Sequence, residues 1–481
     1  MPRPLSGFGL AWRSRSRDWL RFGALAAAVL AAGAIALLPL AWAGALVAAC
    51  LALVLTLVQP LFGLLLVVLA VPFGSLVRVP VAGMNIGVTE ALVWLVLAAW
   101  GMRLVARREV RLRFTWLSLA LALLLGVMLI SLVGARSLEH GAKELVKWIE
   151  VLALYLLVSH ELDERWLRAL VGAILLTGGL AGLHGVYQFV FRIGPEAFVL
   201  FGRFMRAYGT FEQPNPYAGY LGLSVPIGLG LLAGSLIRGV QHTRWRWSAL
   251  AAGTLMLMLA AMAMSWSRGA WLGLAAAVTA MAVVAVLRTQ KRLVFVTVFA
   301  LLIAGGLLVG GLVRVPSSIV QRVADLVPFL TVTDVRGMEV TDANYAVLER
   351  MAHWQAAVGM WADHPWFGVG IGNYEVAYPR YALPTWDEPL GHAHNYYLNI
   401  GAEAGLAGLV GYLLVWTIAW AAAWRACRTA SGWHWGVALG IVGAIVHLCV
   451  HNLFDNLFVH GVYLQVAILL GMIPHLRQGT S

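Results

Sequence analysis

Four polar stretches carry the side chains that could do chemistry in this sequence. Three of them contain an arginine, Arg206, Arg268 and Arg350, and the fourth is the histidine-rich stretch 391–399. A guanidinium stays charged at physiological pH and can donate two parallel hydrogen bonds, which suits a phosphate or pyrophosphate group. A histidine titrates near neutral pH and can take a proton from a hydroxyl. The residue types therefore fit a site that holds a pyrophosphate and activates a hydroxyl.

Each arginine also has an ordinary structural role open to it. Arg206 could anchor the chain at a membrane interface, and Arg268 could extend its charged end to water from a helix start. Arg350 could form an ion pair at the surface. We favour a shared cavity because all four stretches fall at predicted span ends on one side of the membrane, where charge is costly and is usually kept for a site. Several guanidiniums facing one cavity predict pyrophosphate binding.

Two histidines, His392 and His394, lie just before a long apolar run. With Asp387 and Glu388 nearby they could ligate a metal, but their order and spacing match no metal motif. Either could instead be a satisfied polar residue at a helix entrance. We favour a single neutral imidazole acting as general base toward a hydroxyl, and we predict neither a metal nor a cofactor.

The composition places these residues in a membrane protein. The chain has 481 residues, of which 61% are hydrophobic and 12% charged, with a mean hydropathy of +0.82, whereas soluble domains are about a quarter charged. Apolar runs of roughly 17 to 25 residues, long enough to cross a hydrocarbon core, recur from residue 22 almost to the C-terminus. The sequence therefore predicts an all-α, polytopic membrane protein.

The formal net charge of +12 reflects basic clusters between the apolar runs. A nucleic-acid-binding protein would gather such charge on one face or stripe, so we exclude that class. By the positive-inside rule the loops that carry the clusters are cytoplasmic. The clusters lie at 13–21, 103–113, 238–246 and 288–292.

This topology predicts about fourteen spans with both ends of the chain inside, and twelve or thirteen if the first three short runs do not all cross. Three regions result: residues 1–313 with about eleven spans, an outer loop at 314–395, and the last spans in 396–481. The predicted spans are 22–40, 42–59, 61–77, 87–104, 115–134, 143–160, 166–190, 216–237, 247–265, 269–287, 293–313, 396–424, 433–450 and 453–474.

The outer loop is predicted to be partly helical. Five large apolar residues recur at alternating spacings of three and four, which places them on one helix face, and the helix should end at 363–365. The glycine-rich stretch 368–373 follows no strand and opens no helix, so we expect a flexible turn rather than a nucleotide loop. The five residues are Val347, Met351, Trp354, Val358 and Trp361.

In combination, these stretches resemble the O-antigen ligase and polymerase superfamily of bacterial envelope enzymes. The similarity is clearest over 203–273 and 345–412. An arginine precedes a G-T-F and P-N stretch, an S-R-G stands at a helix end, and an arginine and tryptophan precede H-P-x-x-G-V-G. A histidine and asparagine are followed, after nine residues, by G-x-x-G, as in ligases. These motifs fall on Arg206, Gly209, Thr210, Phe211, Pro214 and Asn215; Ser267, Arg268 and Gly269; Arg350, Trp354, His364, Pro365, Gly368, Val369 and Gly370; and His394, Asn395, Gly405 and Gly408.

The resemblance implies an enzyme of the bacterial inner membrane whose active site faces the periplasm. It would transfer a glycan from undecaprenyl pyrophosphate to a hydroxyl of lipid A-core, inverting the anomeric centre without a metal or other cofactor. Arg206 and Arg268 would bind the donor pyrophosphate, with Arg350 also in the donor site, and His394 would deprotonate the acceptor. His392 and Asn395 would belong with the substrate-binding residues, His392 by orienting the loop. These roles are assigned because the residues stand at the matching positions of the family's motifs.

Other functions use the same residues. A polymerase would join repeat units, a related ligase would take a protein or another envelope polymer as acceptor, and a transporter of polyprenyl-linked glycans would need the arginines but not His394. Membrane lipids are expected partners in every case, and nucleic acid in none. The last two predicted spans and the residues between them also contain dense polar residues that we expect to support the cavity, with proton relay left open. They are His447, His451, Asn452, Asp455, Asn456 and His460.

Overall fold

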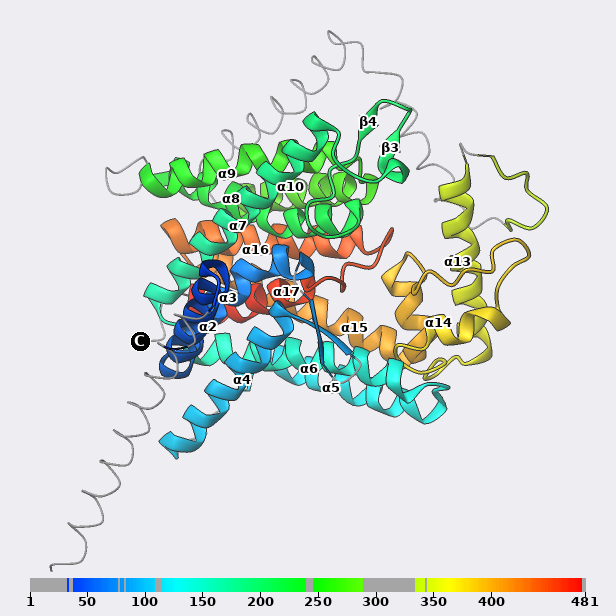
Figure 1. Ribbon diagram of the computed structural model, residues 1–481, viewed down its shortest axis with the longest axis horizontal. Coiled ribbons are helices and arrows are strands. Elements are labelled where there is room, and N and C mark those ends of the chain that lie inside the picture. Colours follow the sequence, from blue (N-terminus) through cyan, green and yellow to red (C-terminus); the bar gives the residue numbers. More distant parts are fainter. Residues whose placement is uncertain are drawn as a thin grey trace, which may run out of the picture.

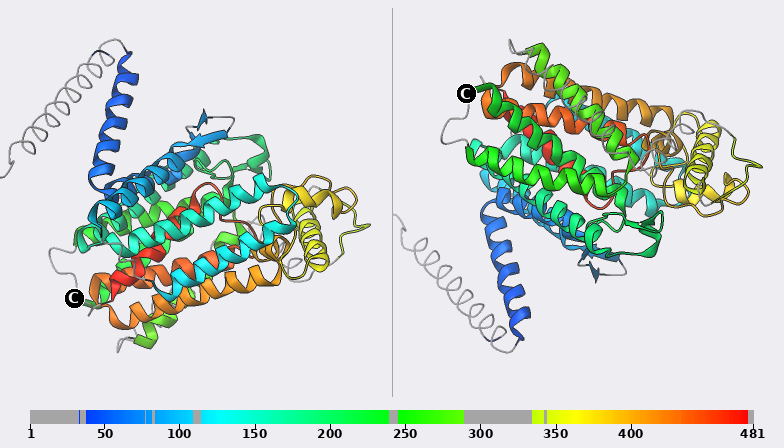
Figure 2. Two further views of the ribbon diagram at one scale, coloured as in Figure 1. Left: turned by 90° about the horizontal axis from the view of Figure 1, so that it is seen from below. Right: turned by 90° about the horizontal axis from the view of Figure 1, so that it is seen from above.

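The computed structural model describes residues 33, 38–76, 78–81, 84–108, 114–238, 245–288, 334–341 and 344–477. Nearly all regular structure in these ranges is α-helical, and most of the helices run side by side in one bundle (Figures 1 and 2). Eight of the described helices are long and apolar enough to cross a membrane. The predicted all-α, polytopic membrane fold is therefore confirmed. These eight are α2 (Leu40–Val58), α4 (Val88–Arg107), α5 (Trp116–Ser131), α7 (Glu164–Phe191), α8 (Pro214–Arg238), α10 (Arg268–Arg288), α15 (Tyr396–Thr429) and α16 (Gly432–His451).

Shorter elements complete the described chain. Three further helices contain shorter apolar segments: α3 (Pro60–Ala70), α9 (Trp245–Met264) and α17 (Val462–Met472). The remaining helices are α6 (Leu138–Glu161), α13 (Tyr345–Asp363) and α14 (Tyr374–Ala377), with 3-10 turns η1 (Val71–Leu76), η2 (Leu132–Gly134), η3 (Glu196–Phe198), η5 (Tyr378–Arg380) and η6 (Ile473–Leu476). Two antiparallel hairpins pair β1 (Arg78–Val81) with β2 (Met84–Gly87), and β3 (Val199–Leu200) with β4 (Phe204–Met205).

Most predicted spans coincide with helices, and the last one needs correction. The span predicted at 453–474 begins instead at Val462, and residues 452–461 form a loop. The polar side chains explain this, because Asn452 accepts a hydrogen bond from the backbone N–H of Leu457, and Asp455 accepts one from Asn456. Such local bonds compete with helical ones. The span at 293–313, and nearly all of 22–40, lie outside the described residues, so a total of twelve to fourteen stays a prediction.

The centre of the bundle is α16, which packs closely on α8 and α10. Glycines make this approach possible: Gly436 lies against Gly230, and a side chain at Gly440 would collide with the backbone of Pro226 and Ile227. Small residues let membrane helices approach so that van der Waals contacts accumulate over the interface. The packing fixes the end of α16, and therefore His451, beside the start of α10 at Gly269.

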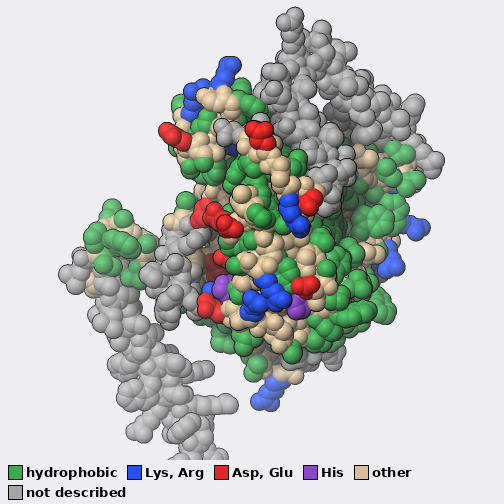
Figure 3. Space-filling view, turned by 90° about the vertical axis from the view of Figure 1, so that its right-hand side faces the viewer, with side chains coloured by type: hydrophobic (Ala, Val, Ile, Leu, Met, Phe, Trp, Pro, Cys, Tyr) green, Lys and Arg blue, Asp and Glu red, His purple; other side chains and the backbone are tan. Residues whose placement is uncertain are grey.

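The helices α13 and α14 cap one end of the bundle, which we call the loop end (Figure 1). Charged and histidine side chains gather on this end, while hydrophobic side chains cover much of the flank (Figure 3). The predicted helix ends at Asp363, as expected. One part of its predicted face is wrong, because Val358 is 44% exposed and the buried side continues instead through Ala356 and Met360.

Candidate active site

The turn before α15 carries the predicted histidines and the cap of the helix. The side chain of Asn395 accepts hydrogen bonds from the backbone N–H groups of Tyr397 (3.0 Å) and Leu398 (3.1 Å), so it serves as the N-cap. Asn395 was predicted among the substrate-binding residues, and in the structure its oxygen is used by the helix. His394 directly before it has φ +51°, a left-handed conformation that costs a residue other than glycine free energy.

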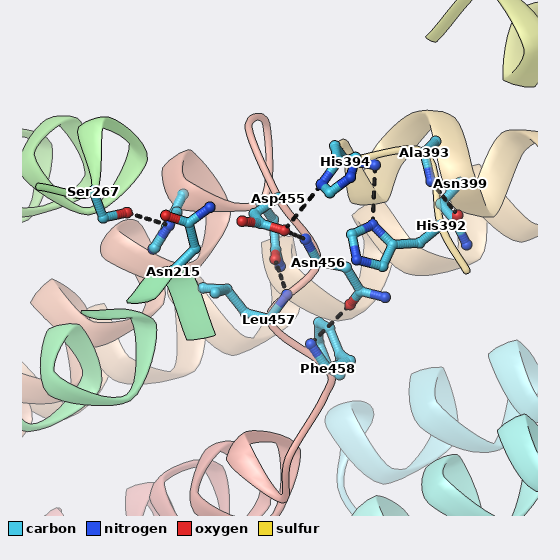
Figure 4. A network of polar contacts seen from close by, with 12 residues as sticks. Asn215, Ser267, His392, Ala393, His394, Asn399, Asp455, Asn456, Leu457 and Phe458 are labelled. Atoms are coloured by element: carbon cyan, nitrogen blue, oxygen red, sulfur yellow. Dashed lines mark hydrogen bonds and ion pairs between the residues drawn. The ribbon is translucent and has the colours of Figure 1, made fainter. Parts of the chain in front are cut away.

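An ion-pair contact joins this turn to the loop that follows α16. Nδ1 of His394 lies 3.6 Å from Oδ1 of Asp455, and the two side chains are 16% and 6% exposed. The backbone N–H of His394 also donates to Nδ1 of His392 at 3.0 Å (Figure 4). Both ring nitrogens of His394 are buried and have no hydrogen-bond partner among the described residues, so the 3.6 Å contact of Nδ1 with Asp455 is an ion-pair contact and not a hydrogen bond. Nε2 is left to receive a hydrogen bond or a proton from a bound molecule.

The charges around Asp455 favour its ionised form. Burial alone would raise the pKa of this carboxyl, but the neighbouring His394, together with His392 and Arg350, holds the pKa well below its usual range. Burial and the nearby His394 lower the pKa of His392 to about 3. The cluster therefore combines a fixed carboxylate with a neutral His392 at neutral pH.

A second layer, which the sequence did not predict, lies behind His394. His353 of α13 is 1% exposed, stacks on Tyr378 at 4.6 Å between ring centroids, and meets the ring of His394 edge-on at 5.8 Å. Its Nδ1 lies 3.0 Å from the hydroxyl of Tyr374. Burial, followed by the charge of His394, lowers the pKa of His353 to about 4. Its position three residues after Arg350 places the two on one helix face, which is the signal that could have found it.

Arg206 extends from the β3–β4 hairpin toward the helices behind it. The backbone N–H of Ala207 donates to the carbonyl of Met264 at 2.9 Å, which ties the hairpin to the end of α9. The guanidinium of Arg206 donates to the carbonyl of Ser265 at 2.8 Å and to the side-chain oxygen of Asn215 at 3.0 Å. These two hydrogen bonds orient the guanidinium of Arg206. One of them is accepted by Asn215, which is the asparagine of the P-N motif.

Arg268 begins α10 and is only 5% exposed. Its neighbour Gly269 lies against His451 and Phe454, so a side chain at that position would collide with the imidazole. On the other side, the hydroxyl of Ser267 lies 3.5 Å from Nε2 of His451. The S-R-G motif is therefore packed on the end of α16, directly before the loop that holds Asp455.

Two groups of predicted residues thus meet around one loop. Arg350, His392 and His394 lie on the side of α13 and α15, and all three affect the charge state of Asp455. The motifs of Arg206 and Arg268 lie on the side of α8 and α10, where Asn215 and Ser267 are drawn in Figure 4. Asp455 was predicted to lie in a helix with a supporting role, and its contact with His394 was not predicted.

The glycine motifs have a structural explanation in a break of α15. Gly405 has φ 66° and ψ −164°, so the helix is interrupted there. The turn before α14 repairs the missing bonds: Val369 and Gly370 donate to the carbonyls of Ala402 and Glu403, each at 2.9 Å, and Leu406 donates to the carbonyl of Pro365 at 2.8 Å. The predicted turn at 368–373 is present, but it is packed against α15 rather than free, and the expectation that it opens no helix is wrong because α14 begins at Tyr374.

Three side chains of the cluster could together hold a metal ion. Ligand atoms of His392, His394 and Asp455 all lie within 4.8 Å of one another. Nδ1 of His392 already accepts the hydrogen bond from His394, so only its Nε2 remains for an ion. The chemistry of a general base needs no metal here, because the carboxylate alone can orient the imidazole.

The fold and this site define a class: a polytopic membrane protein with a histidine–carboxylate pair and buried or half-buried arginines at one end of its bundle. Residues 253–413 match the family described as O-antigen ligase. This region includes α10, α13 and the start of α15, and the match supports the predicted membership in the O-antigen ligase and polymerase superfamily. A search of curated proteins gives no match.

Proposed function

We propose that this protein is a ligase that transfers a glycan from undecaprenyl pyrophosphate to a hydroxyl of lipid A-core on the periplasmic side of the bacterial inner membrane. The observation that carries the proposal is the pair of His394 and Asp455, with Nε2 of His394 left without a partner among the described residues. The family match supports an enzyme that acts on lipid-linked glycans.

In the proposed reaction His394 is the general base. Its Nε2 takes the proton of the acceptor hydroxyl while the hydroxyl oxygen forms a bond to the anomeric carbon of the donor glycan. The bond between that carbon and the pyrophosphate oxygen breaks, and the electron pair leaves with undecaprenyl pyrophosphate. Attack from the face opposite to the leaving group inverts the anomeric centre. Asp455 stabilises the imidazolium that forms, because the two groups are buried and in contact.

The arginines act on the leaving group. Negative charge grows on the pyrophosphate as its bond to the sugar breaks, and fixed guanidiniums stabilise that charge without having to reorganise. Arg206 is held in direction by Ser265 and Asn215, and Arg268 is held at the start of α10. Arg350 adds positive charge near Asp455 and His392. We assign Arg206 and Arg268 to the pyrophosphate, Arg350 to the donor side, and His392 to positioning the turn.

Two other functions remain as alternatives. A polymerase, or a ligase with a protein or another polymer as acceptor, would use the same base and arginines with a different hydroxyl. A transporter of polyprenyl-linked glycans would need the arginines only. The buried contact of His394 with Asp455 favours an enzyme over a transporter, because a transport cavity has no need of an oriented base.

The test uses the purified full chain in detergent with undecaprenyl-pyrophosphate-linked glycan and rough lipopolysaccharide, without added metal. We expect glycan to move to the lipopolysaccharide, and the rate to fall by at least about 10²-fold in His394→Ala. His434→Ala is the matched control, because His434 pairs with Glu164 on the surface at the opposite end of the bundle. Longer lipid-linked chains instead of modified lipopolysaccharide would establish a polymerase. Unchanged transfer in His394→Ala would overturn the proposed mechanism.

A further inference from the structure

A separate cavity of about 570 Å³ lies at the end of the bundle opposite to the loop end. It opens to the surface and is bordered by the beginning of α5, the last third of α6, the last turns of α15, and the end of α17 with η6, whose positions can be followed in Figure 2. Its volume falls in the range of about 300 to 1,000 Å³ that is typical of small-ligand sites. None of its lining residues belongs to the proposed active site.

The lining of the cavity is apolar on its walls and basic at two points. Aliphatic walls come from residues such as Ile418, Ala422 and Leu470, and the charged lining residues are Arg425 and Arg477. Both arginines are exposed, and no Asp or Glu is among the lining residues. The combination of an apolar wall with two cations fits a ligand that has a hydrocarbon part and a negative head.

The start of α5 adds a third source of positive potential. Thr115 caps this helix and, with Trp116 and Leu117, lines the cavity, so the N-terminal end of the helix dipole faces it. The hydroxyl of Thr115 also lies 2.6 Å from that of Tyr155, which closes the wall behind the cap. Trp116 is 74% exposed at the rim, as is usual for tryptophan at a membrane–water interface.

We propose that this cavity binds an anionic phospholipid. The phosphate would lie between Arg425, Arg477 and the start of α5, and an acyl chain would run along the walls formed by α15 and α17. A membrane supplies this ligand at high local concentration, and basic pockets between membrane helices are suited to anionic head groups. The site is a second lipid-binding site, distinct from the donor site, and it does not depend on the proposed reaction.

The experiment measures the thermal unfolding midpoint of the purified full chain in detergent with added lipid. Dioleoylphosphatidylglycerol should raise the midpoint in a saturable way, whereas dioleoylphosphatidylcholine at the same concentration should raise it little. In Arg425→Gln/Arg477→Gln the apparent affinity for phosphatidylglycerol should fall on the order of tenfold or more, because two charge-assisted hydrogen bonds are lost. Arg428→Gln is the control: Arg428 is exposed in the last turn of α15, three residues after Arg425, but does not line the cavity.

A second variant separates loss of charge from loss of space. Ala422→Trp keeps both arginines and fills the cavity, so it should also abolish the response to phosphatidylglycerol. Equal shifts with phosphatidylcholine, or a full response in the double arginine variant, would overturn the proposal. A shift of the same size with inorganic phosphate or glycerol 3-phosphate would also overturn it, by showing a site for free anions rather than for a lipid.

Discussion

Oδ1 of Asp455 lies 3.6 Å from Nδ1 of His394, although the two residues stand on opposite ends of the α15–α16 segment of the chain. The carboxylate can orient the imidazole and stabilise its positive form, and it leaves Nε2 for a substrate. This contact exists because α15 and α16 both have an end at the loop end of the bundle. It gives Asp455 a positioning role in the proposed transfer.

Asp455→Asn should therefore reduce kcat much more than it changes KM for the donor. The amide keeps the shape of the side chain but cannot stabilise the imidazolium, so we expect kcat to fall on the order of 10²-fold or more. Asp455→Glu should recover part of the rate. Initial rates of glycan transfer at varied donor concentration make the measurement, with Asp387→Asn, at an exposed position, as control. A variant whose loss lay entirely in KM would contradict the role.

Arg206→Lys should weaken the use of the donor although it keeps the charge. A lysine ammonium cannot reproduce the fork that joins the carbonyl of Ser265 and the side chain of Asn215, so its direction toward a pyrophosphate is lost. We expect kcat/KM for the lipid-linked donor to fall by about tenfold or more. Arg203→Lys in the exposed tip of the same hairpin should keep the rate, and equal losses in both variants would show that the hairpin alone is responsible.

Removal of metal ions and addition of Zn²⁺ should affect the rate of glycan transfer differently. Treatment with EDTA should leave transfer unchanged, since the proposed base works without an ion. Added Zn²⁺ should inhibit, because His392, His394 and Asp455 are close enough to bind it and the metal would occupy the base. His392→Ala should reduce the sensitivity to Zn²⁺ measured as the concentration for half-inhibition. Loss of activity in EDTA that Zn²⁺ restores would mean that these residues form a catalytic metal site.

The sequence predicted the all-α membrane fold, whereas the roles of the site residues stay predictions. Hydropathy located most helices, because an apolar run of about 20 residues crosses the bilayer as a helix. It failed at residues 452–461, where apolar residues between the polar ones kept the average high although Asn452 and Asp455 bind local backbone. The contact between His394 and Asp455 could not be predicted from spacing. It depends on the packing of α16 against α8 and α10, which only the folded bundle defines.

The folded protein should become less stable in acid because His353 is buried in a neutral form. This histidine is buried, and its pKa is lowered to about 4, so the folded protein binds its proton less readily than the unfolded chain does. Stability is therefore full above the unfolded pKa of about 6.5 and decreases as the pH falls from there toward 4, by up to about 3 kcal/mol for this group. Thermal midpoints from pH 8 to pH 4 measure the effect. In His353→Gln this part of the decrease should disappear, and an unchanged pH dependence would contradict the assignment.

Gly405→Ala tests whether the break in α15 shapes the site. Only glycine adopts φ 66° and ψ −164° without strain. An added Cβ at this position would also collide with the backbone of Trp366 and Phe367. We expect a loss of about 2 kcal/mol or more, seen as a lower thermal midpoint. Transfer should fall as well, because the turn at 365–370 that bonds to the break also connects α13 to α14. Gly126→Ala is the control, since a Cβ there meets nothing within 4 Å and alanine favours a helix. If Gly405→Ala behaved like Gly126→Ala, the break would have no role in holding the loop end together.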